Sequence, residues 1–563
     1  MSASQHIPVL IVGGGPVGLM LSALLSRYGV ESLLVERESS TTNHPQAHVV
    51  NNRSMELFQQ LGIDADIYAN SLGFEWVSNV RWVENMLGRE FASIRTGPTE
   101  EQIARFADIS PAVPASCPQD RVEPVLLAKA QQGPGEISFG TELLSFEARD
   151  DGIQAILRSA NGEHSLSADW LVGCDGAGSQ VRTQSNITMS GLGALAHVVG
   201  IYFHADLGER LADRPAILYF TVDTDEPGIM ISMDGSERWV FHAMWDESRQ
   251  DLSTFNDARC RAIIQRAVGD DIDVDIRSVK PWTMSAQVAD SYRKGRVMLA
   301  GDAAHRFPPT GGYGLNSGVQ DAHNLAWKLA AVVRGQAGEA LLDSYGSERQ
   351  PVALINCEFS ARNAMGIGEV NGAGAKAKAE QVSSGEHSFE EVSQQIRSVA
   401  ERERAHFGAL GLDLGFTYEQ GALITDGSEP PARDNPELDY IPNARPGARA
   451  PHCWVRSRGE QQSLLSLFEG HMTLLVDGEA DAWRSAATGC DYPIQVFAIG
   501  HDLEETGASI AELYGIAGGA VLVRPDGHVG WRSATEVPEP AATLNHVLSS
   551  ILQKPAMHTG DQP

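Results

Sequence analysis

The chain has 563 residues, of which 42% are hydrophobic, and it carries a formal net charge of −30. This length exceeds what one hydrophobic core usually serves, so we expect two or three domains. The acidic balance argues against binding to nucleic acid or to an anionic membrane, because both would repel it. No signal-peptide pattern and no apolar run of membrane-spanning length is present, so we expect a cytoplasmic protein.

The first predicted unit is a strand over 9–12, a glycine-rich turn and a helix over 17–28. The turn reads Gly13-Gly14-Gly15-Pro16-Val17-Gly18, a pattern that binds the pyrophosphate of a dinucleotide at a helix N-terminus. A second strand over 32–35 ends in Glu36, at the spacing where an acidic residue binds a ribose hydroxyl. The alternative is an ordinary glycine turn and a surface glutamate, but the register of strand, helix and acid favours a dinucleotide site.

Two later segments place an aspartate directly after a predicted strand. Strand 170–172 leads into Gly173-Cys174-Asp175-Gly176, and strand 297–300 leads into Gly301-Asp302-Ala303-Ala304-His305. After the second, a Pro/Gly loop precedes a helix beginning near Leu315, whose backbone amides could meet the negative charge of a reduced flavin. Asp302 could accept hydrogen bonds from ribityl hydroxyls, or each aspartate could cap the helix that follows it. With the first motif, these segments predict one flavin site.

In order and spacing, the three motifs resemble those of the class A FAD-dependent aromatic hydroxylases, which have the p-hydroxybenzoate hydroxylase fold. Segments 44–56 and 440–452 are similar to phenol-type members such as 2,4-dichlorophenol 6-monooxygenase and 2-hydroxybiphenyl 3-monooxygenase. The resemblance implies tightly but noncovalently bound FAD, which transiently bound NADH or NADPH reduces. It further implies that a flavin hydroperoxide, formed with O₂, hydroxylates a small phenolic substrate.

The resemblance also implies which residues contact the cofactors. Gln46 stands where many relatives have an arginine that helps to hold the flavin and the nicotinamide, and an amide lacks the charge and the bidentate fork of a guanidinium. The expected cofactor-binding residues are Gly13, Gly15, Pro16, Val17, Gly18, Glu36, Arg37, Gln46, Gln119, Asp175, Asp302, Pro309, Gly312, Gly314, Leu315 and Asn316. The cysteines and histidines show no disulfide framework or metal-ligand spacing, so no metal is predicted.

The predicted catalytic residues are His48 and Pro309, which the resemblance places near the substrate hydroxyl and against the isoalloxazine. An imidazole at His48 could remove the phenol proton and so raise the electron density of the ring, although it could also be structural or contact the flavin. His48 is also a predicted substrate contact. Candidates for stacking on the substrate, which could equally fill a core, are Tyr219, Trp239 and Trp282. His305 is expected to support its loop.

The predicted architecture is α/β. A discontinuous Rossmann-like FAD-binding domain spans 1–80, 105–185 and 290–360, with an inserted antiparallel-sheet substrate domain over 81–104 and 186–289. The alternating residues of 217–222 and 238–245 are typical of such strands. A helical connector and linker over 361–440 leads to a thioredoxin-like α/β domain over 441–563, predicted from strands 472–476 and 494–499, an Asp-Gly hairpin over 520–531 and a helix over 540–553. This domain has no C-x-x-C pair, so we expect a structural role within a homo-oligomer.

Other functions fit the same motifs. A Baeyer–Villiger or polyketide-tailoring flavin monooxygenase would share all of them. A flavin-dependent dehydrogenase would pass electrons on without activating O₂. A non-catalytic flavin-binding protein would instead use the acidic surface and the terminal domain for interactions.

Overall fold

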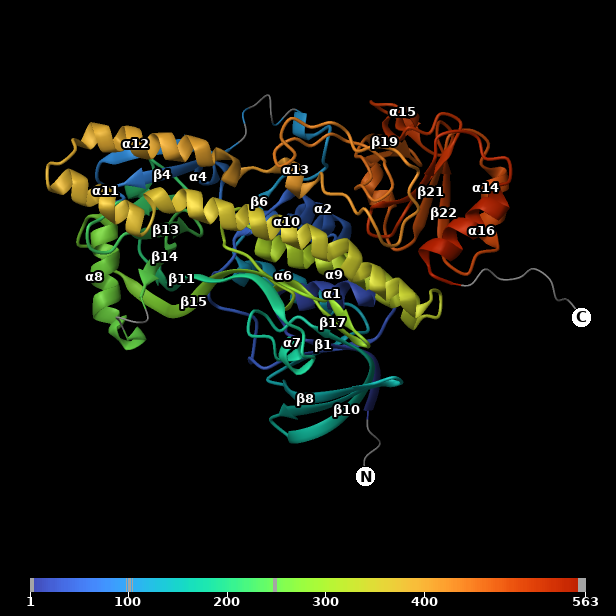
Figure 1. Cartoon of the computed structure of the whole chain (residues 1–563), viewed down its shortest axis with the longest axis horizontal. Coiled ribbons are helices and arrows are strands. Elements are labelled where there is room, and N and C mark those ends of the chain that lie inside the picture. Colours follow the sequence, from blue (N-terminus) through green and yellow to red (C-terminus); the bar gives the residue numbers. More distant parts are fainter. Residues whose placement is uncertain (1–4, 98, 100–102, 104, 247–250, 555–563) are drawn as a thin grey trace, which may run out of the picture.

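The computed structural model describes residues 5–97, 99, 103, 105–246 and 251–554. The predicted domain boundaries at residues 1, 104 and 563 lie outside this part of the chain. The fold has three bodies that lie side by side: a central α/β body stands between a second sheet and a C-terminal domain (Figure 1). The predicted α/β fold class is confirmed. No helix in the described ranges combines the length and apolarity needed to cross a membrane.

The central sheet is parallel in the strand order β7-β2-β1-β10-β17. Its strands are β1 (Gln5–Val12), β2 (Ser32–Glu36), β7 (Glu136–Phe139), β10 (Gly162–Gly173) and β17 (Val297–Leu299). The edge strand β16 (Arg293–Lys294) and the strands β8 (Glu142–Arg149) and β9 (Gly152–Ser159) extend it by antiparallel pairing. Helices cover the parallel strands, so their sequences are continuous apolar runs such as 9–12.

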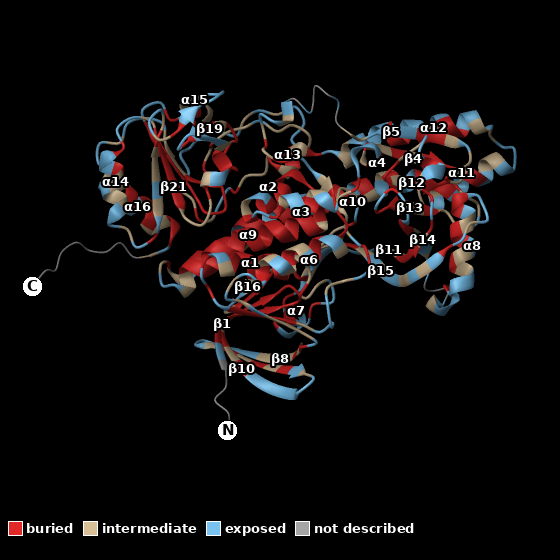
Figure 2. Ribbon diagram, turned by 180° about the vertical axis from the view of Figure 1, so that it is seen from behind, coloured by how far each residue is buried: buried red, intermediate tan, exposed pale blue. Residues whose placement is uncertain are grey.

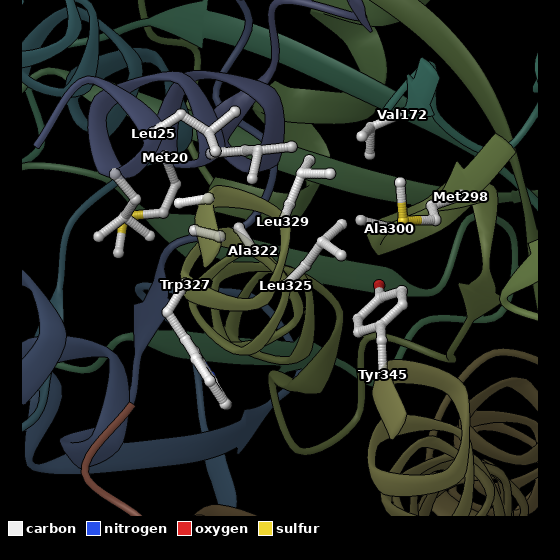
Figure 3. Packing of buried hydrophobic residues seen from close by; sticks show 14 of the residues in the cluster. Met20, Leu25, Val172, Met298, Ala300, Ala322, Leu325, Trp327, Leu329 and Tyr345 are labelled. Atoms are coloured by element: carbon white, nitrogen blue, oxygen red, sulfur yellow. The ribbon is translucent and has the colours of Figure 1, made fainter. Parts of the chain in front are cut away.

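Helix α9 (Tyr313–Val333) is buried over almost its whole length, and helix α1 (Pro16–Arg27) is buried over residues 18–25 (Figure 2). Their apolar side chains meet those of β10 and β17 in one core, to which Met20, Leu325 and Met298 belong (Figure 3). Helix α9 begins at Tyr313, close to the predicted start near Leu315, because Gly312 adopts the left-handed conformation (φ 72°) and forms the N-cap. The helix start is therefore fixed by a glycine.

The second sheet has the order β18-β15-β11-β14-β13-β12-β4-β5 and is antiparallel except between β12 and β4. Its strands are β4 (Asn79–Val83), β5 (Glu90–Arg95), β11 (Met189–His204), β12 (Leu218–Thr221), β13 (Gly228–Ser232), β14 (Arg238–Trp245), β15 (Asp275–Ala289) and β18 (His305–Arg306). The strands predicted at 217–222 and 238–245 are confirmed as β12 and β14.

Helices that share one core with the second sheet include α8 (Asp257–Val268), α11 (Ala373–Ser383) and α12 (Phe389–Arg402). Residues 373–402, expected to form a connector, therefore form a layer against this sheet. Helix α10 (Asp343–Ile367) runs between the second sheet and the C-terminal domain (Figure 1).

The C-terminal domain has the sheet order β22-β21-β24-β25, in which β22 pairs parallel and β24 antiparallel with β21. Its elements are β21 (Met472–Val476), α14 (Asp481–Thr488), β22 (Ile494–Ala498), α15 (Ile510–Tyr514), β24 (Ala520–Val523), β25 (Val529–Ser533) and α16 (Pro540–Ile551). This is the predicted thioredoxin-like arrangement, with Gly527 left-handed (φ 73°) in the hairpin turn. A small separate sheet contains β19 (Trp454–Ser457), β20 (Glu460–Ser463) and β23 (Glu504–Glu505).

Most of the remaining elements border the central body: β3 (Val49–Val50), α2 (Asn52–Leu61), α3 (Asp64–Ala69), β6 (Ala115–Ser116), α6 (Gln119–Ala130), α7 (Gln180–Gln184) and α13 (Leu410–Asp413). Helix α4 (Phe74–Val77) instead packs with the second sheet, since its Trp76 belongs to the core of that sheet. Strands β3 and β6 pair with each other. In the sequence, β3 lies between β2 of the central sheet and β4 of the second sheet, and β6 lies between β5 of the second sheet and β7 of the central sheet.

Candidate functional site

The glycine-rich motifs meet at the carboxyl ends of β1, β10 and β17. A Cβ on Gly13, which has φ 110°, would lie 2.3 Å from the carbonyl oxygen of Cys174, so the turn after β1 packs directly on the turn after β10. A Cβ on Gly18 would lie 2.0 Å from the carbonyl oxygen of Gly13. Both positions therefore require glycine. We call the space outside these strand ends, between the N-termini of α1 and α9, the crevice; ligands of open α/β sheets bind in such a place.

Gly15 differs from its neighbours because a Cβ there would meet no atom within 4 Å. It is the N-cap of α1, in an extended conformation, and Pro16 follows it at the first helical position. The first-turn N–H groups of a helix lack intrahelical partners and carry its positive dipole end. An open space in front of these groups fits the pyrophosphate of FAD.

The Glu36 carboxylate lies beside this turn. It accepts hydrogen bonds from the backbone N–H of Gly14 at 2.6 Å and of Glu38 at 2.8 Å. A carboxylate has about four acceptor positions, so two are left for the predicted ribose contact. Arg37 is exposed, with its Nε 3.6 Å from Glu38.

Asp302 and the start of α9 form the opposite side of the crevice. A Cβ on Gly314 would lie 3.9 Å from Asp302 Oδ1, so the carboxylate lies beside the helix start. Asp302 is exposed, and no group in the described part of the chain hydrogen-bonds to its carboxylate. It therefore does not cap a helix, which favours the predicted ribityl contact. Pro309 is also exposed, and its carbonyl accepts from Gly312 N–H at 3.0 Å.

Val17 joins the two sides of the crevice. Cβ atoms on Gly301 and Gly318 would lie 2.8 and 2.5 Å from Val17 Cγ2, so α1, α9 and the end of β17 are in direct contact. Leu315 is buried in the same core. The side chain of Val17 is thus a packing element between the two helices.

Three other predicted cofactor residues use their side chains within the protein. Asp175 accepts hydrogen bonds from Ser179 Oγ at 2.5 Å and from Val181 N–H in the first turn of α7 at 3.0 Å, as the capping alternative expects, while Ser179 is the N-cap of that helix. Gln119 Nε2 donates to Glu123 at 2.7 Å. Asn316 Nδ2 donates to the carbonyls of Val49 and Gly312. Asn316 therefore connects β3 to the loop before α9. Gln46, another predicted cofactor residue, is exposed.

Three histidines, which we call the histidine cluster, gather between the crevice and the second sheet: His44, His48 and His242. His48 precedes Val49, and a Cβ on Gly312 would lie 2.9 Å from Val49 Cβ, so His48 lies beside the start of α9. His48 Nδ1 is 3.2 Å from Ser116 Oγ, and His44 Nδ1 is 2.6 Å from Ser278 Oγ.

Burial lowers the pKa of each of the three imidazoles to about 4. For His242 the other two histidines lower the pKa further, which places all three within electrostatic reach of one another. The cluster is therefore uncharged at neutral pH. Trp282, a predicted substrate contact, is half-buried with its ring 5.4 Å from that of His242, so it lies at the edge of the cluster.

The other two aromatic candidates lie elsewhere. Tyr219 and Trp239 are fully buried in the core that the second sheet shares with its helices. Tyr219 donates its hydroxyl proton to the carbonyl of Arg214 at 2.9 Å, and Trp239 Nε1 donates to the carbonyl of Ala205 at 3.2 Å. The prediction that they stack on a substrate is wrong, because both rings fill this core and satisfy their polar atoms there.

The predicted supporting role of His305 is confirmed. This fully buried imidazole has its Nε2 2.8 Å from Asp321 Oδ2, which also accepts from Gly301 N–H at 3.2 Å. Arg349 Nε donates to the other oxygen of Asp321 at 2.8 Å. Burial raises the pKa of Asp321, but Arg349 and His305 outweigh it and leave the pKa below its usual value. An ionised Asp321 thus holds the end of β17 in place.

Comparisons with known proteins agree with this geometry. A family model described as FAD binding domain matches residues 6–360, and one described as aromatic-ring hydroxylase, C-terminal, matches residues 443–555. A Streptomyces halstedii protein, provisionally named a polyketide hydroxylase, is 39% identical over 97% of each chain.

Two further relatives cover nearly the whole chain. The 2,4-dichlorophenol 6-monooxygenase of Cupriavidus pinatubonensis is 30% identical over 96% of this chain and 95% of its own. The flavin-dependent monooxygenase PieE, solved with FAD and substrate, superposes with a TM-score of 0.89 at 32% identity, over 98% of this chain and 99% of that one. The similarity drawn from local motifs therefore extends over all three bodies.

Proposed function

Because the chain belongs to the FAD-dependent aromatic-ring hydroxylases, we propose that it hydroxylates a phenolic ring of an aromatic polyketide. The identity of 39% to the S. halstedii protein, against 30% to the dichlorophenol monooxygenase, supports a polyketide over a simple phenol. The polyketide-tailoring alternative is thereby preferred to the small phenol that the sequence motifs suggested.

FAD, when bound, would supply the transfer of reducing equivalents from NADH or NADPH to O₂ and of one oxygen atom to the ring. The first-turn amides of α1 at Gly15 would hold its pyrophosphate, Glu36 its ribose and Asp302 its ribityl chain. The N-terminus of α9 would favour negative charge on the reduced ring.

The observation that carries this proposal is the position of His48, next to the start of α9 and in reach of the second sheet. With a pKa of about 4, the imidazole is neutral and can accept a hydrogen bond from a phenol. Full proton transfer from a phenol of pKa about 10 would cost about 8 kcal/mol. We therefore assign His48 as the hydrogen-bond acceptor that orients and polarises the phenol, a weaker role than the predicted base.

The test is oxygen incorporation by the FAD-loaded protein. Hydroxynaphthoquinones, hydroxyanthraquinones and simple phenols are incubated with NADH or NADPH under ¹⁸O₂, and products are analysed by mass spectrometry. We expect one ¹⁸O on a ring carbon of a polycyclic phenol. Insertion of oxygen beside a carbonyl would indicate a Baeyer–Villiger reaction, and electron transfer to a dye without oxygen incorporation a dehydrogenase. Light scattering on the same sample tests the expected homo-oligomer.

A further inference from the structure

Two histidines of the cluster present a ring nitrogen to the same point above β11. A Cβ built on Gly200 would lie 3.5 Å from His44 Nε2 and 3.7 Å from His242 Nε2. Gly200 and His242 are directly paired between β11 and β14, so both belong to one face of the second sheet. Because Gly200 has no side chain, the position that a methyl group would fill, in van der Waals contact with both imidazoles, stays free of this residue's own atoms.

Neither Nε2 atom is used by the protein itself. His44 is anchored through Nδ1 to Ser278, and His242 packs its ring against Trp282. Across the described ranges, no hydrogen bond engages Nε2 of His44 or of His242. Neither nitrogen is among the fully buried polar atoms that lack a partner, so both keep access to solvent. Two accessible, unbonded nitrogens that face one point can bind a polar group that comes from outside the chain.

The charge state of the pair defines that partner. Burial, assisted by Lys280, lowers the pKa of His44 to about 4, and burial with the neighbouring histidines does the same for His242. A neutral imidazole nitrogen donates or accepts one hydrogen bond, depending on its tautomer. Both kinds of bond suit a hydroxyl or carbonyl oxygen.

We propose that His44 and His242 anchor a second oxygen substituent of the aromatic substrate, and that Gly200 keeps the space for it open. This inference rests on the proposed function and extends it, because it describes the substrate as a fused ring system with at least two oxygens. His48 then contacts the oxygen next to the hydroxylated carbon, and Trp282 offers a face or edge to the ring. Gly200 becomes a specificity-determining position.

The experiment measures how strongly the FAD-loaded protein prefers a second oxygen. Naphthalen-1-ol, naphthalene-1,5-diol and naphthalene-1,8-diol are titrated in turn, and the change in flavin absorption gives each Kd. One added hydrogen bond to a neutral group predicts that at least one diol binds roughly five- to tenfold more tightly than the mono-ol. In His242→Leu this ratio should fall toward one, whereas His242→Gln should retain part of it.

Gly200→Ala tests the same idea without removing a buried polar group. Its new Cβ would be in ordinary van der Waals contact with both imidazoles, so the protein should fold, yet the space for the oxygen would be filled. The matched control is His204→Leu on the same strand face, since His204 Nε2 is already bonded to the hydroxyl of Tyr202 at 2.9 Å. That variant should keep the wild-type ratio.

The inference is overturned if the wild-type protein binds neither diol more tightly than the mono-ol. It is also overturned if the preference survives in both His242→Leu and Gly200→Ala, or is lost equally in His204→Leu. Failure of the proposed function looks different: the naphthols would bind, with or without a preference, but none would be hydroxylated.

Discussion

His48 and Ser116 meet at the antiparallel pair of short strands, β3 and β6: His48 directly precedes β3, and Ser116 belongs to β6. The imidazole is held from one side by the serine, and its other nitrogen is left for a ligand. Because the backbone carbonyl of the next residue, Val49, accepts from Asn316 at 2.9 Å, the position of His48 is fixed relative to α9. A change at this residue should therefore affect the substrate more than the cofactor.

Replacing His48 should separate flavin reduction from oxygen transfer. His48→Ala is expected to retain FAD and nicotinamide-dependent reduction, while hydroxylated product falls by roughly ten- to a thousandfold, because the phenol loses the hydrogen bond that orients and polarises it. The unused reducing equivalents should appear as hydrogen peroxide, and a higher pH should partly restore product because phenolate then forms in solution. His6→Ala, at an exposed histidine, is the control. An unchanged ratio of product to NAD(P)H consumed would rule out this role.

The histidine cluster should also make the protein sensitive to mild acid. A histidine whose pKa is about 4 when folded and 6.5 when unfolded binds more protons in the unfolded state between these values, so stability falls as the pH is lowered. For one such group, the loss between pH 7 and pH 5 is about 2 kcal/mol. His242→Gln should therefore reduce the difference between the unfolding free energies measured in urea at pH 7 and pH 5. An unaltered difference would mean that folding leaves the pKa of His242 at its ordinary value.

For single residues, the sequence indicates which side chains could carry chemistry, but it does not show which face of the sheet each side chain points to. Trp239 and His242 lie three positions apart on β14, so strand alternation places them on opposite faces. The sequence pattern predicts that alternation, but which face meets the crevice depends on how the sheet packs. The sequence therefore predicts a substrate contact at Trp239, and it gives no signal that distinguishes His242 on the opposite face.

At the scale of elements, the crevice lies between the N-termini of two helices, α1 and α9, each of which begins directly after a glycine-containing turn. The unit over 9–28 could be predicted because strand, turn and helix are contiguous and each glycine has a local reason. The layer formed by α11 and α12 could not, because an amphipathic helix such as α12 shows that Val392, Ile396 and Val399 are buried but not against what. Contiguous motifs are thus readable from sequence, whereas partners distant in the chain are not.

The open space at Gly15 gives a direct test of the cofactor cradle. In Gly15→Ala, the added methyl group projects into the place proposed for the pyrophosphate, so FAD affinity should fall by at least roughly tenfold while the fold is retained. Gly73→Ala provides a matched control, since Gly73 is also the N-cap of a helix with no atom within 4 Å of its Cβ position. Equal FAD dissociation constants for the two variants, measured by flavin fluorescence, would contradict the assignment.

Across the whole molecule, buried ion pairs connect the C-terminal domain to the central body. Arg524 of the β24–β25 hairpin donates to both oxygens of Glu348 on α10, at 2.7 and 2.8 Å, and Lys328 of α9 donates to the same carboxylate at 2.7 Å. All three side chains are fully buried. Arg449 makes a comparable buried pair with Glu56 of α2. Buried ion pairs therefore join the C-terminal domain firmly to the central body, which carries the crevice.

Breaking this connection should destabilise the entire chain. Arg524→Met leaves Glu348 buried with less compensation, and loss of one partner of a buried pair typically costs about 3–5 kcal/mol. The control in the same domain is Arg484→Met, whose exposed pairs with Asp481 and Asp502 should contribute about 1 kcal/mol or less. Thermal unfolding monitored by flavin release and by circular dichroism should show one lowered transition for Arg524→Met. A separate early transition confined to the C-terminal domain would contradict this coupling.

The short strand β18 has a further consequence. It consists of the first two residues of the loop that leads to α9, and it pairs with β15, so that Arg306 lies opposite Gln287 and His305 opposite Val288. The loop beside the crevice is therefore an edge strand of the second sheet. A ligand that stabilises the second sheet should therefore also slow the exchange of backbone amide hydrogens in this loop. An aromatic ligand bound against β11 should protect the amides of residues 305 and 306, although these residues belong to the predicted FAD-binding domain.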